Sequence, residues 1–314
     1  MTVGVVLTNG LEAVVIADSR VSGFGRQSDS VNKMGVFSSE NYSGVIFGAG
    51  NANLIEEVIK YANQFSGENL KDFISAAQLQ HKSSVDNNDM AYLRYLKGEI
   101  DKKADTMFAD EAERNQFIQQ QTAMAIQQYE QFKNNPEGQT SFILTAFDRS
   151  RKKIRNFFIN TNTYDENFLD RIEIGSGSDG ANMYFVTKLQ GLDITKLSLS
   201  DMAFFVTNAY SQSTINQGVG GTPKIAIVSE DGTVVLDVKK SRVLANISGA
   251  YLAEFPASGL SHSRTRSYFS EVLGGSPRYG IIAQVLGLNK ETLTTTYIPF
   301  SSWQERANNL MFPK

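Results

Sequence analysis

The chain has 314 residues, of which 41% are hydrophobic and 20% are charged, and its formal net charge is −3. This composition is typical of a soluble globular protein with one large domain or two ordinary ones. The slightly acidic balance argues against a nucleic-acid partner, and no apolar run reaches the roughly 20 residues of a membrane span, so we expect no membrane partner either.

The first 50 residues predict antiparallel strands. Apolar, β-branched runs alternate with turn residues, and Asn9-Gly10 is a strong signal for a hairpin between the first two runs. The expected strands cover residues 2–7, 13–17, 33–37 and 44–47, with a polar loop at 22–30.

The following region predicts helices. Apolar residues recur at helical spacing over 54–65, a second helix begins near Phe73, and 86–134 keeps the helical period despite many polar residues. Pro136 lies in the turn that ends this region. On the last of these helices we expect a narrow apolar stripe that packs on a neighbouring subunit, formed by Ile118, Ala125, Tyr129 and Phe132.

Strand pairs and helices alternate in the rest of the chain. The expected strands cover residues 142–147, 154–159, 225–228 and 233–238. The expected helices cover 181–189, 202–214, 265–273, 279–286 and 302–310. The order along the chain is a run of strands, helices, a strand pair, helices and a second strand pair. This order favours two antiparallel sheets with helices packed outside, in a layered α+β domain.

The cysteine and histidine counts restrict the chemistry. The sequence has no cysteine, which excludes disulfides, cysteine–zinc sites, iron–sulfur clusters and thiol catalysis. The two histidines, His81 and His262, lie in a polar stretch and between two serines, and neither position suggests a catalytic base. We therefore expect no metal and no cofactor, and a base other than histidine if the chain is an enzyme.

Thr2 is a candidate nucleophile. Methionine before a small residue is usually removed by methionine aminopeptidase, and removal of Met1 would leave a threonine with a free α-amine. This amine has a reference pKa of about 7.7–8.0, so it can accept the hydroxyl proton without a histidine. Asp18 closes an expected strand and Lys33 opens another, positions that ordinary turn and surface residues also occupy.

Several segments together resemble the start of a proteasome β-type subunit, a member of the N-terminal-nucleophile hydrolases. Asp18 lies at the family's distance from Thr2, and Arg20 follows two positions later as in the family. The first segments read Thr2-Val3-Gly4-Val5-Val6, Val15-Ile16-Ala17-Asp18-Ser19-Arg20-Val21, Lys33-Met34-Gly35-Val36-Phe37 and Phe47-Gly48-Ala49-Gly50-Asn51-Ala52. Later matches are Gly175-Ser176-Gly177-Ser178 and Gly220-Gly221. Within the family, the sequences of these motifs are most similar to the Anbu branch of bacterial proteasome homologues.

The resemblance covers residues 2 to about 80 and 139–240, and it implies a fold. That fold is the four-layer αββα sandwich of the family, expected over residues 1–240. The family core lacks a counterpart of the helical region 81–138, which we interpret as an insertion. Residues 241–314 form an extension that we expect to pack on the core or on a neighbouring subunit.

The resemblance also implies a mechanism. The Thr2 hydroxyl attacks an amide carbonyl, and the Thr2 amine accepts the proton. Lys33 favours the deprotonated amine, Asp18 pairs with Lys33, and Ser176 forms a hydrogen bond near the amine. Water then hydrolyses the acyl-enzyme. The residues expected to donate to the oxyanion or to support the site are Gly48, with Gly50 as the alternative, Arg20 and Asn216.

The chain departs from the proteolytic subunits at two supporting positions, where Asn216 and Val219 replace the usual Asp and Ser. The leading hypothesis is a cytoplasmic threonine peptidase that acts on peptides or proteins as a homo-oligomer. One alternative is a ligase in which another amine intercepts the acyl-enzyme. The other is a non-catalytic structural subunit, which retention of Met1 would favour.

Overall fold

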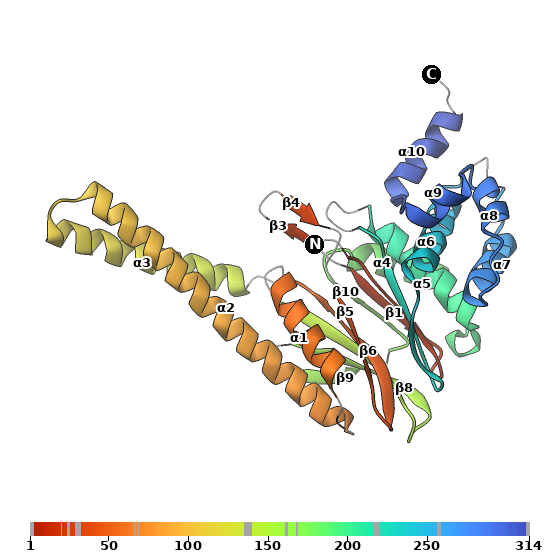
Figure 1. Cartoon of the computed structure of the whole chain (residues 1–314), viewed down its shortest axis with the longest axis horizontal. Helices are drawn as coiled ribbons and strands as arrows, with labels where there is room; N and C mark the ends of the chain where they lie inside the picture. The colour runs from red at the N-terminus through yellow and green to blue at the C-terminus, as the bar shows by residue number, and fades with distance from the viewer. Residues whose placement is uncertain are drawn as a thin grey trace.

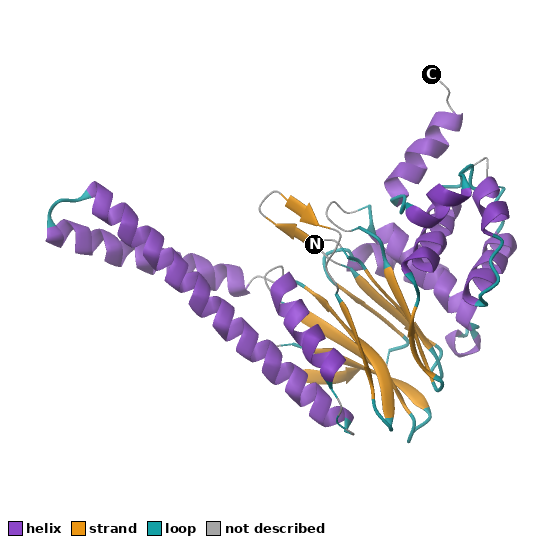
Figure 2. Cartoon of the chain, viewed as in Figure 1, coloured by secondary structure: helices purple, strands orange, loops and turns teal. Residues whose placement is uncertain are grey.

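The structure of the chain is a computed structural model. The residues it describes are 3–19, 21–23, 26–28, 33–65, 67, 69–134, 140–160, 163–167, 169–215, 220–255 and 259–311. Within these residues the fold is built on two antiparallel five-stranded sheets, flanked by helices (Figures 1 and 2). The prediction of two antiparallel sheets in a mixed α and β chain is confirmed.

The first sheet has the strand order β10-β1-β2-β11-β12. Its strands are β1 (Gly4–Thr8), β2 (Ala13–Ala17), β10 (Arg171–Ile174), β11 (Lys224–Ser229) and β12 (Gly232–Val235). The predicted turn at Asn9-Gly10 joins β1 to β2, and every residue of these two strands is buried. Burial on both faces explains why both strands are continuous apolar runs rather than alternating ones.

The second sheet has the order β5-β6-β7-β8-β9. Its strands are β5 (Met34–Ser38), β6 (Tyr42–Ala49), β7 (Ser141–Asp148), β8 (Lys153–Ile159) and β9 (Tyr164–Asn167). A separate short hairpin pairs β3 (Val21–Gly23) with β4 (Arg26–Ser28). This hairpin corrects the prediction of a loop over 22–30, because Gly and Ser weaken the strand signal in the sequence.

Helices lie beside both sheets, and Figure 1 shows where each one runs. Beside the second sheet are α1 (Ala52–Gln64), α2 (Leu70–Met107) and α3 (Glu111–Asn134). Beside the first sheet are α4 (Ser178–Lys188), α5 (Leu199–Ser213), α6 (Val238–Leu252), α7 (His262–Leu273), α8 (Tyr279–Val285), α9 (Lys290–Thr295) and α10 (Phe300–Met311). No helix in the described part of the chain combines the length and the hydrophobicity needed to cross a membrane.

The two sheets pack face to face. A buried apolar cluster takes Val6 and Val15 from the first sheet and Phe47 and Ile143 from the second. A separate cluster joins the second sheet to the helices beside it, for example through Phe73 of α2.

The C-terminal helices belong to the core of the first sheet. One buried cluster includes Val5 of β1, Phe204 of α5, Ile247 of α6 and Trp303 of α10. Residues beyond 240 therefore pack on the described sheet within the same chain.

The helices α2 and α3 form a long hairpin that extends away from the sheets (Figure 1). With 38 residues, α2 is roughly 55 Å long at 1.5 Å per residue. Tyr129 of α3 donates a hydrogen bond to Asp89 of α2, and its ring lies 4.8 Å from that of Tyr92. Tyr129, one residue of the expected stripe, thus contacts α2 of its own chain. The side chain of Phe132 lies outside the described part.

The strand expected at 233–238 ends earlier than predicted. Asp237 is the N-cap of α6, and its Oδ1 accepts a hydrogen bond of 2.8 Å from the Lys240 N–H. A capping carboxylate starts a helix at this point, so Val238 begins α6 instead of extending the strand.

Candidate active site

An ion pair joins the two sheets at one edge. Asp18 follows the last residue of β2, and Lys33 precedes the first residue of β5. Lys33 Nζ donates to Asp18 Oδ1 at 2.8 Å, and the two side chains are 1% and 0% exposed. The contact expected between these residues is therefore present, between strands that belong to different sheets.

Asp18 also holds the start of β1. The Val3 N–H donates to Asp18 Oδ1 at 3.3 Å, and the Asp18 N–H donates to the Val3 carbonyl at 3.1 Å. These bonds continue the β1–β2 ladder, in which Gly4 lies opposite Ala17. Val3, just before β1, is therefore bonded to the ion pair. Four residues considered from the sequence lie outside the described part, namely Thr2, Arg20, Asn216 and Val219.

Burial and pairing have opposite effects on the pKa of the Asp18 carboxyl. Burial is the larger effect and raises its pKa to about 6, while Lys33 and the backbone of Val3 and Gly220 lower it. Burying a pair of opposite charges costs several kcal/mol of solvation, which a purely structural contact rarely recovers. A strongly shifted carboxyl with a specific partner is typical of functional sites.

Gly4 lets the sheets approach each other beside this pair. A Cβ at Gly4 would lie 2.2 Å from a ring carbon of Phe47 in the second sheet. Because no real Cβ tolerates such a contact, any other residue would push the sheets apart next to Asp18. No motif in the sequence indicates this role of Gly4, because it depends on a contact between two sheets.

Ser176 lies at the same sheet edge. In the β1–β10 pairing Gly4 is opposite Ile174, and Ser176 follows two residues later. The turn depends on Gly175, whose φ of 92° favours glycine, and on a 3.0 Å bond from the Ser178 N–H to the Gly175 carbonyl. Gly177 then caps α4. The expected support of the Thr2 amine by Ser176 stays a prediction.

The glycines proposed to bind the oxyanion differ in position. The Gly48 N–H donates to the Lys33 carbonyl at 3.2 Å, inside the β5–β6 ladder. This bond occupies the donor and argues against Gly48. Gly50 lies just beyond β6, is exposed, and has a φ of 122°. We therefore transfer the role to Gly50, the alternative considered from the sequence.

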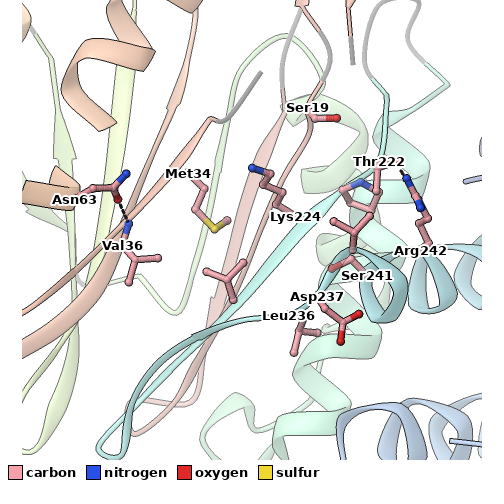
Figure 3. Close-up of a pocket in the computed structure, with 13 residues that line it drawn as sticks. Ser19, Met34, Val36, Asn63, Thr222, Lys224, Leu236, Asp237, Ser241 and Arg242 are labelled. Carbon is pink, nitrogen blue, oxygen red and sulfur yellow. Dashed lines mark hydrogen bonds between the residues drawn. The ribbon is translucent and has the colours of Figure 1, made fainter. Parts of the chain in front are cut away.

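A cavity of about 460 Å³ is lined by residues of both sheets and of α6 (Figure 3). Ser19 and Met34 line it, and they are the chain neighbours of Asp18 and Lys33. Thr222, Lys224, Ser241 and Arg242 contribute most of its remaining polar groups. None of these four residues was predictable as part of a site from a sequence motif. One signal was available in the sequence. Lys224 begins an apolar strand, just as Lys33 directly precedes one, and this shared position could have indicated Lys224 as a second candidate lysine.

The described residues hold no group of three or more His, Asp or Glu side chains that could bind a metal ion.

The comparisons with known proteins find structural likeness without sequence likeness. No family model matches the chain, and no curated protein does. Among solved structures, 520 chains match. One is a Gly-1 mutant of Anbu from Hyphomicrobium sp. strain MC1, with 15% identity, 81% of this chain and 97% of that chain covered, and a TM-score of 0.50. The fold of this chain is similar to that of Anbu. At such low identity the likeness shows the fold alone.

Proposed function

We propose that the chain is a threonine-type N-terminal-nucleophile hydrolase that cleaves peptide or amide bonds. The observation that carries this proposal is the buried Asp18–Lys33 pair, which is bound to the Val3 N–H at the start of β1. Thr2 is covalently joined to that nitrogen, so removal of Met1 would create its free amine within a few bond lengths of the pair. The similarity of the fold to Anbu supports the fold that this proposal requires.

The proposed reaction uses Thr2 as both nucleophile and base. Its Oγ attacks the carbonyl carbon, and the Oγ proton passes to the α-amine, directly or through water. The tetrahedral intermediate collapses, the leaving amine takes that proton, and an ester on Thr2 remains. Water attacks the ester, the α-amine accepts the proton of the water, and the Oγ is restored as the acid product leaves.

The surrounding residues set the charges for these steps. The positive charge of Lys33 favours the neutral form of the amine, and Asp18 keeps Lys33 charged and oriented. Gly50 donates its N–H to the oxyanion. Ser176, Arg20 and Asn216 support the amine and the strand end.

The proposal includes the finer features expected from the sequence. The two sheets and their flanking helices form the four-layer αββα sandwich over 1–240. The region 81–138 is an insertion, and 241–314 is an extension. We propose a cytoplasmic homo-oligomer that acts on peptides or proteins.

The test combines mass and activity. Intact-mass measurement of natively expressed protein should show loss of Met1, and N-terminal sequencing should read Thr-Val-Gly-Val-Val. Thr2→Ala should abolish cleavage of fluorogenic peptides, because it removes the nucleophile. Thr2→Ser, the matched control, should retain measurable cleavage. Full activity with Met1 retained, or equal activity of Thr2→Ala and wild type, would overturn the proposal.

A further inference from the structure

We propose that Tyr210 of α5 is a positioning residue of the candidate site, because its hydroxyl holds the turn at Gly220 and Gly221 against Asp18. This inference rests on the proposed function for its catalytic meaning and on the contacts of Tyr210 for its geometry. Tyr210 acts through two backbone groups. The Gly221 carbonyl accepts a hydrogen bond from the Tyr210 hydroxyl, and the Gly220 N–H interacts with the Asp18 carboxyl.

The bond between Tyr210 and the turn lies in the protein interior. The Tyr210 hydroxyl donates to the Gly221 carbonyl at 3.1 Å, and both residues are buried. A buried carbonyl that loses its donor is costly, because water cannot replace the lost bond. The bond therefore favours the one placement of the turn in which Gly221 reaches Tyr210.

The turn passes beside Asp18 on its way into the first sheet. Gly220 and Gly221 have φ values of 150° and 80°, a region that residues with a Cβ rarely adopt. The turn leads into β11, whose first residue, Lys224, lies opposite Ala17 of β2. Since Asp18 directly follows Ala17, the residues just before β11 lie next to the ion pair.

Few donors stabilise the negative charge of Asp18. Its Oδ1 accepts hydrogen bonds from Lys33 Nζ and from the Val3 N–H. Its Oδ2 is buried and accepts no hydrogen bond of normal geometry among the described residues. Burial raises the pKa of Asp18, and the Gly220 N–H is one of the groups that lower it. A displacement of Gly220 would therefore act on a carboxylate with few other donors.

The helix α5 is a fixed support for Tyr210. On one side Asn208 Nδ2 donates to the Tyr184 hydroxyl of α4 at 2.9 Å. On the other side Ser211 shares a hydrogen bond of 3.1 Å with Ser248 of α6, and both of these bonds are buried. Ser248 belongs to the expected C-terminal extension, so this extension is bonded to the helix that carries Tyr210.

Two lysines lie near the groups that this inference invokes. Lys33 of the ion pair lowers the pKa of Asp18 by its charge and its hydrogen bond. Lys224 of the neighbouring strand β11 lines the cavity in Figure 3. In the proposed reaction ionised Asp18 keeps Lys33 charged, so the Gly220 N–H helps to maintain both charges of the pair. Neither lysine changes in the variants below.

The experiment removes one oxygen atom from the full chain. Tyr210→Phe keeps the ring and loses the donor to the turn. Tyr184→Phe is the matched control, because it also removes a buried hydroxyl from the helical layer, one that contacts Asn208 instead of the turn. Wild type and each variant are compared with and without Asp18→Asn by urea titration from about pH 4 to pH 8. In each background the free energy of unfolding without Asp18→Asn, minus that with it, changes with pH up to the pKa of Asp18 in the folded chain.

We expect the upper end of this pH window to move upward by about 0.5–1 unit in Tyr210→Phe, because the carboxylate loses part of the stabilisation from the Gly220 N–H. Tyr184→Phe should leave the window unchanged, even where it lowers overall stability. An unmoved window in Tyr210→Phe, or an equal move in both variants, would overturn the inference.

Cleavage of fluorogenic peptides gives a second readout. In Tyr210→Phe the acid limb of kcat/KM against pH should move in the same direction, with most of the activity recovered at higher pH, because ionised Asp18 is needed. A uniform loss of kcat/KM at every pH would indicate a structural role alone and contradict the positioning role. Absence of cleavage in wild type would count against the hydrolase proposal, whereas the unfolding measurement would still decide whether Tyr210 acts on Asp18.

Discussion

At the scale of single residues, the buried pair of Asp18 and Lys33 should be the most sensitive contact of the site. Lys33→Met keeps the apolar stem but leaves the Asp18 carboxyl buried without its cation. We expect a loss of about 3–5 kcal/mol in the free energy of unfolding at neutral pH. Denaturant titration measures it. The double variant Asp18→Asn/Lys33→Met should recover much of the loss, because both charges are gone; a double variant as unstable as Lys33→Met would contradict the pairing.

The shifted pKa of Asp18 predicts a pH dependence. Its pKa is about 6 in the folded chain against an ordinary value of 3.8. The folded state therefore binds more protons than the unfolded state between these values, and the Asp18 contribution to stability falls as pH rises through this window. The free energy of unfolding of wild type minus that of Asp18→Asn should fall by on the order of 2 kcal/mol between pH 4 and pH 7. A flat difference would show that the carboxyl is not shifted.

Sequence patterns identify the residues of the ion pair but not those of the cavity. Asp18 and Lys33 are predictable because strand ends and spacing place them in the order of a known family. Ser19 and Ser241 are not, because the lining of a cavity is a property of tertiary packing. Gly48 was chosen for its place in a motif, and only the ladder bond to the Lys33 carbonyl shows that its donor is occupied.

At the scale of elements, α2 is attached to the sheet through a buried histidine. His81 is fully buried, its ring lies 5.0 Å from Phe142, and neither ring nitrogen has a hydrogen-bond partner among the described residues. Burial lowers its pKa to about 4 from the ordinary 6.5. The unfolded chain thus binds more protons between these values, so His81 reduces stability as pH falls.

His81→Phe should remove this acid sensitivity. The free energy of unfolding of the variant minus that of wild type should be larger at pH 4.5 than at pH 7.5 by on the order of 2 kcal/mol. Urea titration at both pH values measures the gain. No change of the difference with pH would mean that His81 is protonated or hydrated in the folded chain.

The α2–α3 hairpin should be separable from the core. From α2 and α3, the buried cluster on the second sheet uses Leu70, Phe73, Ile74 and Ala77. The Tyr129–Asp89 and Tyr129–Tyr92 contacts place residues 87 and 133 at the same level of the hairpin. A four-residue Gly-Ser linker can span the 8–10 Å between such helices.

Replacing 88–132 by that linker should leave a folded core, with a stability change within about 2 kcal/mol, because closure entropy depends weakly on loop length. Light scattering should show a smaller assembly than the full chain, since exposed Met90, Tyr95 and Met124 are lost. An unfolded variant would contradict the assignment of an independent arm. An unchanged assembly mass would exclude the hairpin from the subunit contacts.

Long periodic elements were predictable and short polar ones were not. The strand expected at 13–17 matches β2, and the apolar periodicity of 54–65 matches α1 closely. In contrast, β9 has exposed, acidic residues that carry little strand signal. The helix α6 was also not predicted, because its first residue, Val238, continues an apolar run and only the Asp237 cap marks the boundary.

At the scale of the whole molecule, the two sheets meet so that the start of β1, the end of β2 and the start of β5 share one edge. The Asp18–Lys33 bond and the Gly4–Phe47 approach hold this edge together. Sequence order alone could not show that strands of different sheets converge there, because sheet packing depends on contacts between distant segments. The fold thus holds Val3, the first described residue, beside the buried Asp18–Lys33 pair.

The most direct test of this account is the site at which a peptide epoxyketone reacts. The Thr2 Oγ adds to the ketone carbonyl and the Thr2 α-amine opens the epoxide, so both atoms of one residue become bonded to the probe and its whole mass is retained. We predict that tandem mass spectrometry will find this adduct on an N-terminal Thr2 peptide in wild type and not in Thr2→Ala. An adduct elsewhere, or none on a chain shown to begin at Thr2, would contradict the central claim.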